Sequence, residues 1–273
     1  MPDPRPVTPL GIAADLLEQV EKRLAGVDGV GDDVRADLAR ATSLVAGLDP
    51  YVAAVTSPAS PALEALETRT RQADWGTRTE QAGLVLEQEM LSGHVEGRFL
   101  AFLVHATRAR RVLEVGMFTG YSALTMAEAV GAGGSVVACE LDPATAAFAQ
   151  DCFASSEAGE RITVEVGPAA DTLVRLADDG ALFDLVFVDA DKPGYAGYLD
   201  AVLGTGPDDP GLLADGGVVC VDNTLLQGEP WAATAGSANG RAVAAFNERV
   251  AADPRVEQVL VPLRDGVTLL RRV

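Results

Sequence analysis

The amino-acid sequence predicts a doubly wound α/β fold with a mostly parallel, seven-stranded sheet, and three observations support this prediction. From residue 110 onward, short apolar runs alternate with Ala- and Leu-rich stretches that are long enough for helices. The runs are continuously apolar, which is typical of parallel strands that helices cover on both faces. The length of 273 residues is sufficient for one such domain and an N-terminal extension.

The segment before residue 110 has apolar residues at helical spacing. Two groups show this spacing: Leu16, Leu17, Val20 and Leu24, and then Leu38, Leu44, Val45 and Leu48. A stretch rich in Pro and Ser over residues 56–61 interrupts the pattern, and residues 80–107 are predicted to be helical again with a break near Ser92. We therefore expect a helical extension over residues 1–85, followed by the main domain over residues 86–273.

In the main domain, strands are expected at 111–115, 135–140, 162–166, 183–188 and 217–221. The helices that alternate with them are expected at 121–131, 143–155, 169–179, 194–204 and 239–252. Two further apolar runs, 256–263 and 267–272, are separated by Arg264-Asp265-Gly266. Because Asp-Gly is a strong hairpin signal, we expect the sheet to end in an antiparallel pair of strands.

The composition limits the possible partners and compartments. The formal net charge is −19, so the chain repels phosphate backbones and anionic lipid, and we expect neither nucleic acid nor a membrane as a partner. The N-terminus lacks the apolar segment of a signal peptide, which predicts a cytoplasmic protein. Cys139, Cys152 and Cys220 match no zinc or redox spacing, and we interpret them as reduced thiols of the core.

The first candidate site is the segment from Glu114 to Ser122, a strand followed by a glycine turn that opens a helix. Gly116 allows the backbone to approach a ligand closely, and the helix N-terminus attracts a carboxylate. Phe118 stands where a dinucleotide motif requires its second glycine, which argues against NAD or FAD. Glu140 ends the next strand, where a carboxylate can accept both hydroxyls of a ribose. The alternatives are a purely structural turn and a solvated loop carboxylate.

The second candidate site lies at the ends of two later strands. Asp189-Ala-Asp191-Lys192 follows the strand at 183–188, and Asp222-Asn223 follows the strand at 217–221. Oxygen side chains that converge in this way suit Mg²⁺, although single residues of these types are often helix caps or turns. Lys192 is one of only two lysines in an arginine-rich set of basic residues, and lysine, unlike arginine, can act as a base.

Four sequence pieces carry a resemblance to a known family: LEVGMFTGYSALTMAEA, FVDADKPGY, VDNTLLQG and LRDGVTLL. In order and spacing they resemble the cation-dependent O-methyltransferases of the catechol and caffeoyl-CoA type, over a region from about Met90 to the C-terminus. The resemblance implies a Rossmann-like methyltransferase domain that uses S-adenosylmethionine as methyl donor and Mg²⁺ or another divalent cation. It also implies a small-molecule acceptor with two neighbouring oxygens, and a homodimer.

The resemblance further implies a role for individual residues. Asp189, Asp222 and Asn223 match the metal ligands of the family, and Lys192 matches its general base. The positions that match contacts to S-adenosylmethionine are Met90, Ser92, Glu114, Gly116, Met117, Ser122, Glu140, Ala169, Asp189 and Tyr198. The cation is expected to orient one acceptor oxygen at the methyl group, to lower its pKa, and to lower the pKa of Lys192 by like charge.

A narrower resemblance involves pieces outside that shared region, namely RPVTPLGI, AGLDPY, LEQEMLSGHVEGRFL and RVEQVLVPLRDG. These are similar to the O-methyltransferases of mycosporine biosynthesis, which implies demethyl-4-deoxygadusol as the acceptor and 4-deoxygadusol as the product. The alternative acceptor is a catechol or a phenylpropanoid. A nicotinamide-dependent oxidoreductase and a non-catalytic S-adenosylmethionine-binding protein are the competing classes. Trp231, in the loop 228–240, is expected either to cover the acceptor or only to pack the loop, and His94 is a further candidate contact.

Overall fold

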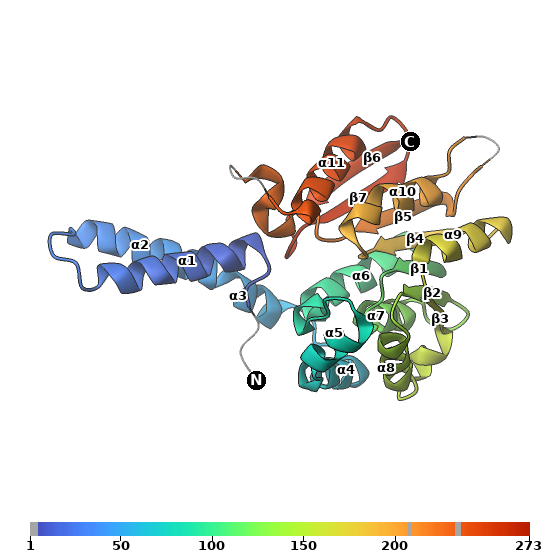
Figure 1. The fold of residues 1–273 in the computed structure, drawn as a ribbon, viewed down its shortest axis with the longest axis horizontal. Coiled ribbons are helices and arrows are strands. Elements are labelled where there is room, and N and C mark those ends of the chain that lie inside the picture. Colours follow the sequence, from blue (N-terminus) through green and yellow to red (C-terminus); the bar gives the residue numbers. More distant parts are fainter. Residues whose placement is uncertain (1–4, 207–208, 233–235) are drawn as a thin grey trace.

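The sheet has seven strands in the order β3-β2-β1-β4-β5-β7-β6, and this confirms the predicted fold class (Figure 1). The computed structural model describes residues 5–206, 209–232 and 236–273. The strands are β1 (Arg111–Val115), β2 (Ser135–Glu140), β3 (Ile162–Val166), β4 (Phe183–Val188), β5 (Leu213–Val221), β6 (Val256–Val261) and β7 (Val267–Arg272). Strands β1 to β5 pair in parallel, whereas β7 pairs antiparallel with both β5 and β6.

Helices cover both faces of this sheet, as the continuously apolar strands predict. One face packs against α4 (Pro61–Gln72), α6 (Gly93–Thr107), α7 (Tyr121–Val130) and α8 (Pro143–Phe153). The other packs against α9 (Ala169–Asp178), α10 (Tyr195–Leu203) and α11 (Ala238–Ala252). Side chains alternate along β1, so Val112 lies in the first core and Leu113 in the second.

Two regions differ most from the prediction. Strand β5 begins at Leu213 rather than at residue 217, because Leu213 pairs with Phe183 across a register shift that accommodates the intervening glycines. The stretch 80–107 is not one interrupted helix. Helix α5 (Trp75–Ala82) ends at Gly83, whose φ of 66° is a left-handed C-cap, and only η1 (Gln88–Met90) precedes α6.

The residues before position 85 take two different places. Helix α4 contributes Leu63 and Leu66 to the core of the main domain, and the ring of Trp75 packs against that of Phe118 with 4.8 Å between the ring centroids. In contrast, α1 (Pro9–Leu24) and α2 (Asp32–Ala46) form a hairpin that projects from the body and is joined to it through α3 (Leu48–Val55) (Figure 1). Helix α4 thus packs into the core of the main domain although it precedes residue 85. The predicted domain boundary at residue 85 stays a prediction.

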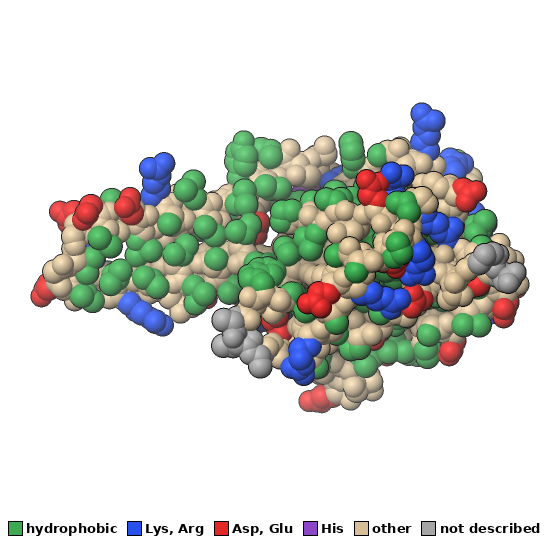
Figure 2. Space-filling model, turned by 90° about the horizontal axis from the view of Figure 1, so that it is seen from above, with side chains coloured by type: hydrophobic (Ala, Val, Ile, Leu, Met, Phe, Trp, Pro, Cys, Tyr) green, Lys and Arg blue, Asp and Glu red, His purple; other side chains and the backbone are tan. Residues whose placement is uncertain are grey.

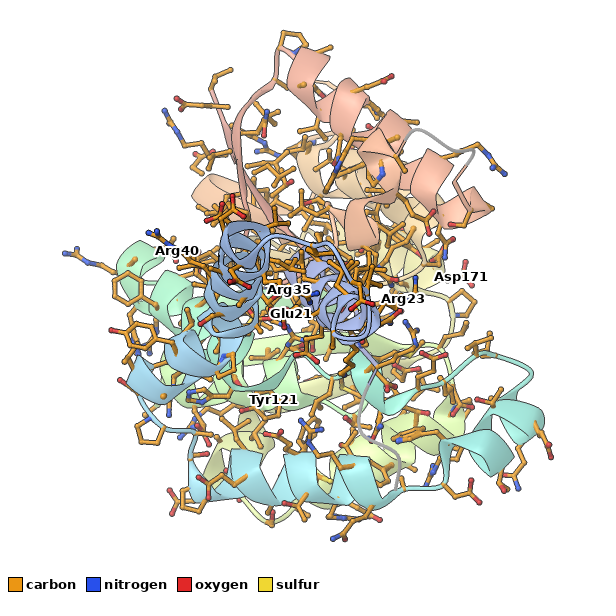
Figure 3. The ribbon with its side chains drawn as sticks, turned by 90° about the vertical axis from the view of Figure 1, so that its left-hand side faces the viewer. Glu21, Arg23, Arg35, Arg40, Tyr121 and Asp171 are labelled. Carbon is orange, nitrogen blue, oxygen red and sulfur yellow. The ribbon has the colours of Figure 1, made fainter. Side chains whose placement is uncertain are left out.

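The α1–α2 hairpin has almost no fully buried residues, and the side chain of Arg35 closes its turn. Arg35 lies between the two helices when the hairpin is viewed along its length (Figure 3), and its guanidinium donates to the carbonyls of Leu24 and Val27 at 2.6 and 2.7 Å. No residue of α1 is buried, and only Thr42 of α2 is. None of the helices in the described ranges is long and apolar enough to span a lipid bilayer.

Candidate active site

A cavity of about 610 Å³ opens at the carboxyl ends of the parallel strands. It lies beside β1 and β4, where the strand order reverses direction, which is the usual ligand-binding position in open α/β sheets. All but one of the sequence-predicted site residues line it: Met90, Ser92, Gly116, Met117, Ser122, Glu140, Ala169, Asp189, Lys192, Tyr198, Asp222 and Asn223. The sheet topology thus brings together residues that are far apart in the sequence.

Glu140 is fixed in orientation by two backbone N–H groups. Phe118 N donates to its Oε2 at 2.8 Å, and Asp142 N donates to its Oε1 at 2.9 Å. Phe118 has a φ of 51°, and this left-handed conformation is part of the turn that directs its N–H to Glu140. Each carboxylate oxygen keeps acceptor capacity for a second hydrogen bond, so Glu140 fits the predicted role of holding two ribose hydroxyls.

Gly116 is required for the close packing of two strand ends. Its φ is 93°, and a Cβ at this position would lie 2.3 Å from the carbonyl oxygen of Asp189. The end of β1 therefore packs directly on the end of β4. This close approach places the glycine turn and the Asp189 segment on the same side of the cavity.

Glu114 is the exception among the predicted cofactor contacts. It lies on β1 with no exposed surface, does not line the cavity, and neither of its carboxylate oxygens has a hydrogen-bond partner. Burial raises the pKa of its carboxyl group well above the usual value. Its predicted contact with S-adenosylmethionine stays a prediction.

The predicted metal ligands surround the ammonium group of Lys192. Its three N–H donors are shared among four acceptors: Asp189 Oδ1 at 3.0 Å, Asn223 Oδ1 at 2.7 Å, the Tyr195 hydroxyl at 2.6 Å and the carbonyl of Ala190 at 3.1 Å. The Tyr195 hydroxyl in turn donates to the carbonyl of Asp222 at 2.9 Å. A single positive charge thus lies between the two oxygens that are predicted to bind a cation.

These contacts influence the protonation of Lys192. Burial alone lowers the pKa of the lysine, but Tyr195 and the charges of Asp189 and Asp222 outweigh it and raise the pKa above its usual value. This direction is opposite to the lowering of the pKa that is expected beside a bound cation. The expected lowering requires a cation that neutralises these carboxylates.

Besides Glu114, two buried carboxyl groups have an oxygen without a hydrogen-bond partner. They are Oδ1 of Asp222 and Oε1 of Glu96, and both residues line the cavity. Burial and then the charge of Asp189 raise the pKa of Asp222 to about 7, and burial and then Asp222 raise the pKa of Glu96 well above its usual value. Unpartnered carboxylate oxygens beside Asp189 and Asn223 fit a divalent cation, which prefers oxygen ligands.

No three His, Cys, Asp or Glu side chains in the described ranges are arranged to hold a metal ion. The predicted set contains only two residues of these types, because its third member is Asn223. The fit to a cation therefore depends on an amide oxygen and on positions left for an acceptor and water.

Backbone strain is concentrated around this cavity. Six non-glycine residues in the described part of the chain have positive φ. Five of them line the cavity: Phe118, Asn223, Leu226, Gln227 and Arg264. Because such conformations cost free energy in bulky residues, their clustering marks a functional region.

Several cavity residues were missed by the sequence analysis as site residues. Arg5, Val7 and Thr8 reach the cavity from the segment before α1, and Arg264 and Asp265 reach it from the β6–β7 turn. Glu96 could have been found as an acidic residue in the apolar run of α6. Trp231 is 61 % exposed and, like His94, is not among the described residues that line the cavity; residues 233–235 of its loop lie outside the described ranges. The three cysteines are buried free thiols, as expected.

Comparison with known proteins settles the family. Residues 76–273 match the O-methyltransferase family. The chain is 33 % identical over 189 residues to the caffeoyl-CoA O-methyltransferase of Petroselinum crispum, an alignment that covers 65 % of this chain and 75 % of that protein. The chain belongs to this O-methyltransferase family.

Solved structures agree with this assignment and support the cofactor. The Podospora anserina methyltransferase PaMTH1 bound to S-adenosylhomocysteine matches with a TM-score of 0.69 and 28 % identity, over 91 % of this chain and 99 % of that one. The Bacillus cereus O-methyltransferase in complex with S-adenosylhomocysteine matches with a TM-score of 0.69 and 26 % identity, over 83 % and 97 % of the two chains. The protein is therefore an S-adenosylmethionine-dependent O-methyltransferase.

The unpartnered burial of Glu114 predicts a pH-dependent gain in stability for Glu114→Gln. A carboxyl group whose pKa is raised by folding contributes its stability below the unfolded pKa of about 4.5 and loses it as the pH rises toward the folded pKa. The variant should therefore gain on the wild type with increasing pH, by up to about 1.4 kcal/mol per pH unit. Denaturant unfolding without cofactor from pH 5 to 8 measures this difference.

The same substitution at the exposed Glu248 of α11 is the matched control and should change stability by less than about 0.5 kcal/mol at every pH. A stability difference for Glu114→Gln that does not vary with pH would contradict the buried-carboxyl interpretation.

Proposed function

We propose that this methyltransferase is cation-dependent and methylates one of two neighbouring oxygens on a small acceptor molecule. The observation that carries the proposal is the position of the Lys192 ammonium, which lies within hydrogen-bonding distance of both Asp189 and Asn223. The oxygens of Asp189 and Asn223 therefore converge on one point where the fold places positive charge. Together with the unpartnered Oδ1 of Asp222, they are the kind of oxygen ligands that a divalent cation prefers.

We propose that Asp189, Asp222 and Asn223 hold this cation. A divalent cation bound there supplies Lewis acidity, which lowers the pKa of an acceptor hydroxyl. Glu140 holds the ribose of S-adenosylmethionine, and the N-terminus of α7 together with Ser122 faces its carboxylate. Lys192 lies at the same place and takes the hydroxyl proton once the charges of Asp189 and Asp222 are neutralised.

Two acceptor classes remain for this site. A catechol or phenylpropanoid has the better support, because the chain is similar to a caffeoyl-CoA O-methyltransferase over most of that protein's length. Demethyl-4-deoxygadusol is the second candidate. It is favoured by the resemblance of residues 5–12 to mycosporine enzymes, since Arg5, Val7 and Thr8 of that piece line the cavity. Both acceptors carry two neighbouring oxygens.

Removal of divalent cations should abolish methyl transfer and leave cofactor binding largely intact, because the proposed cation holds the acceptor. Turnover with catechol, caffeate, caffeoyl-CoA and demethyl-4-deoxygadusol is measured with Mg²⁺ and with EDTA, and binding of S-adenosylhomocysteine is measured by calorimetry. Asp222→Asn should behave like chelation, whereas the same change at the exposed Asp151 should have no effect. Full activity in EDTA would refute the cation-dependent proposal.

Lys192→Arg should lower kcat by a factor of about 10² to 10⁴, the usual size of a general-base contribution. The variant keeps a positive charge between Asp189 and Asn223, but arginine does not lose its proton near neutral pH. Affinities for cofactor and acceptor should change much less than kcat. The pH profile of kcat is the decisive measurement: the rising limb of the wild type should disappear in the variant. Near-wild-type kcat from pH 6 to 9 would restrict Lys192 to positioning the acceptor.

We also propose that the chain forms a homodimer through the α1–α2 hairpin. Figure 2 shows apolar side chains spread along this projecting part of the molecule, and Leu16 and Leu44 are 56 % and 68 % exposed. Apolar surface of this kind favours a protein partner. Analytical ultracentrifugation should give twice the chain mass, and Leu16→Glu with Leu44→Glu should shift the equilibrium to monomer. A wild-type protein that is monomeric at micromolar concentration would contradict the dimer.

A further inference from the structure

The guanidinium of Arg264 faces the cavity with its donors poorly used. Its side chain is 29 % exposed, and its Nη1 lies 3.4 Å from Glu96 Oε2. Its other contacts are to the carbonyl of Leu91, at 3.4 Å from Nη1 and 3.5 Å from Nη2. N–H···O hydrogen bonds usually measure about 2.7 to 3.2 Å, and a guanidinium has five donors. Arg264 therefore keeps donor capacity for a ligand, and it lines the cavity.

The other cations that line the described cavity are already engaged. Lys192 Nζ has four acceptors within 3.1 Å. Arg5 pairs with Glu87 at 2.6 Å. Arg264 is thus the one cation among the described lining residues that has no hydrogen bond of usual length.

The position of Arg264 is fixed by its turn. Its φ of 49° is a left-handed conformation, and the turn is tied to the loop that follows Asp222 and Asn223. Leu225 N donates to the carbonyl of Asp265 at 2.8 Å, and Gln227 N donates to Asp265 Oδ1 at 2.6 Å. These hydrogen bonds impose the strained conformation of Arg264 and keep its turn next to the loop that carries the proposed metal ligands.

The charges that face Arg264 come from three elements. Glu96 of α6 is 2 % exposed, and Asp222 after β5 and Asp265 in the turn also lie close enough for Arg264 to act on their charges. Glu96 is thus the buried ion-pair partner of the guanidinium, and the partly exposed Arg264 lines the same cavity. A planar guanidinium in this setting is suited to a carboxylate, which it binds with two parallel hydrogen bonds.

We propose that Arg264 binds a carboxylate on the methyl acceptor, so that this enzyme prefers acidic acceptors over neutral ones of the same shape. The inference rests on the proposed function, because it names the acceptor class of the same site. Arg264 acts here as a specificity-determining residue, and Glu96 acts as a positioning residue for it.

The test compares acceptors that differ only in charge. The probes are 3,4-dihydroxybenzoate and caffeate, each paired with its neutral methyl ester, so that two distances between the ring oxygens and the carboxylate are covered. Wild-type enzyme should have a lower KM for each acid than for its ester. Arg264→Gln should raise the KM for the preferred acid about 10- to 100-fold, as expected for a charged hydrogen-bonded pair, with kcat within a few-fold. The esters should change less than threefold.

Three further variants keep the result interpretable. Arg264→Lys retains the charge without the fork and should recover part of the preference, and it guards against misfolding of the Gln variant. Arg271→Gln makes the same change at an exposed ion pair on β7 and should alter neither acceptor class. Glu96→Gln should raise the KM of the acids by a larger factor than the KM of the esters.

Binding measured by calorimetry on protein loaded with S-adenosylhomocysteine separates the possible failures. Loss of S-adenosylhomocysteine affinity in Arg264→Gln would show that Arg264 binds the cofactor carboxylate, and would overturn the inference. An equal effect on acids and esters, or no wild-type preference at either length, would overturn it as well. If wild-type enzyme methylated none of these catechols, the proposed acceptor class would fail, whereas charge-dependent binding lost in Arg264→Gln would still support Arg264.

Discussion

The hydrogen bonds of the Lys192 ammonium hold the candidate site together. This one group connects Asp189 at the end of β4 with Asn223 after β5, and through Tyr195 it also reaches the backbone of Asp222. Buried carboxylates at the ends of adjacent strands repel one another, and an unpaired buried charge is costly. The lysine compensates this charge within the fold. The arrangement of oxygens that suits a cation is therefore stabilised by the residue that is also proposed to take the acceptor proton.

This arrangement requires unfavourable backbone conformations. The loop after β5 contains three residues with positive φ: Asn223, Leu226 and Gln227. Arg264 shares this property and is hydrogen-bonded to the same loop through its turn. Conformations of this kind persist only where the surrounding structure imposes them. The antiparallel β5–β7 pairing imposes them here, because it brings the β6–β7 turn against the loop that carries Asp222 and Asn223.

Much of the fold and site could be predicted because their signals are local. The apolar runs that become β1 to β4 have the predicted bounds, and the residues at their carboxyl ends meet because parallel strands end at a common edge. The contributions of Arg5, Glu96 and Arg264 to the cavity could not be predicted in this way. They depend on packing between the N-terminal segment, α6 and the β6–β7 turn, and no periodicity records which helix lies against which turn. The raised pKa of Lys192 also follows from its three-dimensional neighbours rather than from its sequence motif.

The charges that line the cavity favour some ligands and oppose others. The chain carries a net charge of −19, and Glu140, Asp189, Asp222 and Asp265 all line the cavity. This field favours a sulfonium donor and a divalent cation, both of which are positive, and it opposes an acceptor that carries a carboxylate. An acidic acceptor therefore needs a local positive group that no cavity carboxylate fully engages. Arg264 has that position, since it lines the cavity and its contacts to Glu96 and to the Leu91 carbonyl are all 3.4 Å or longer.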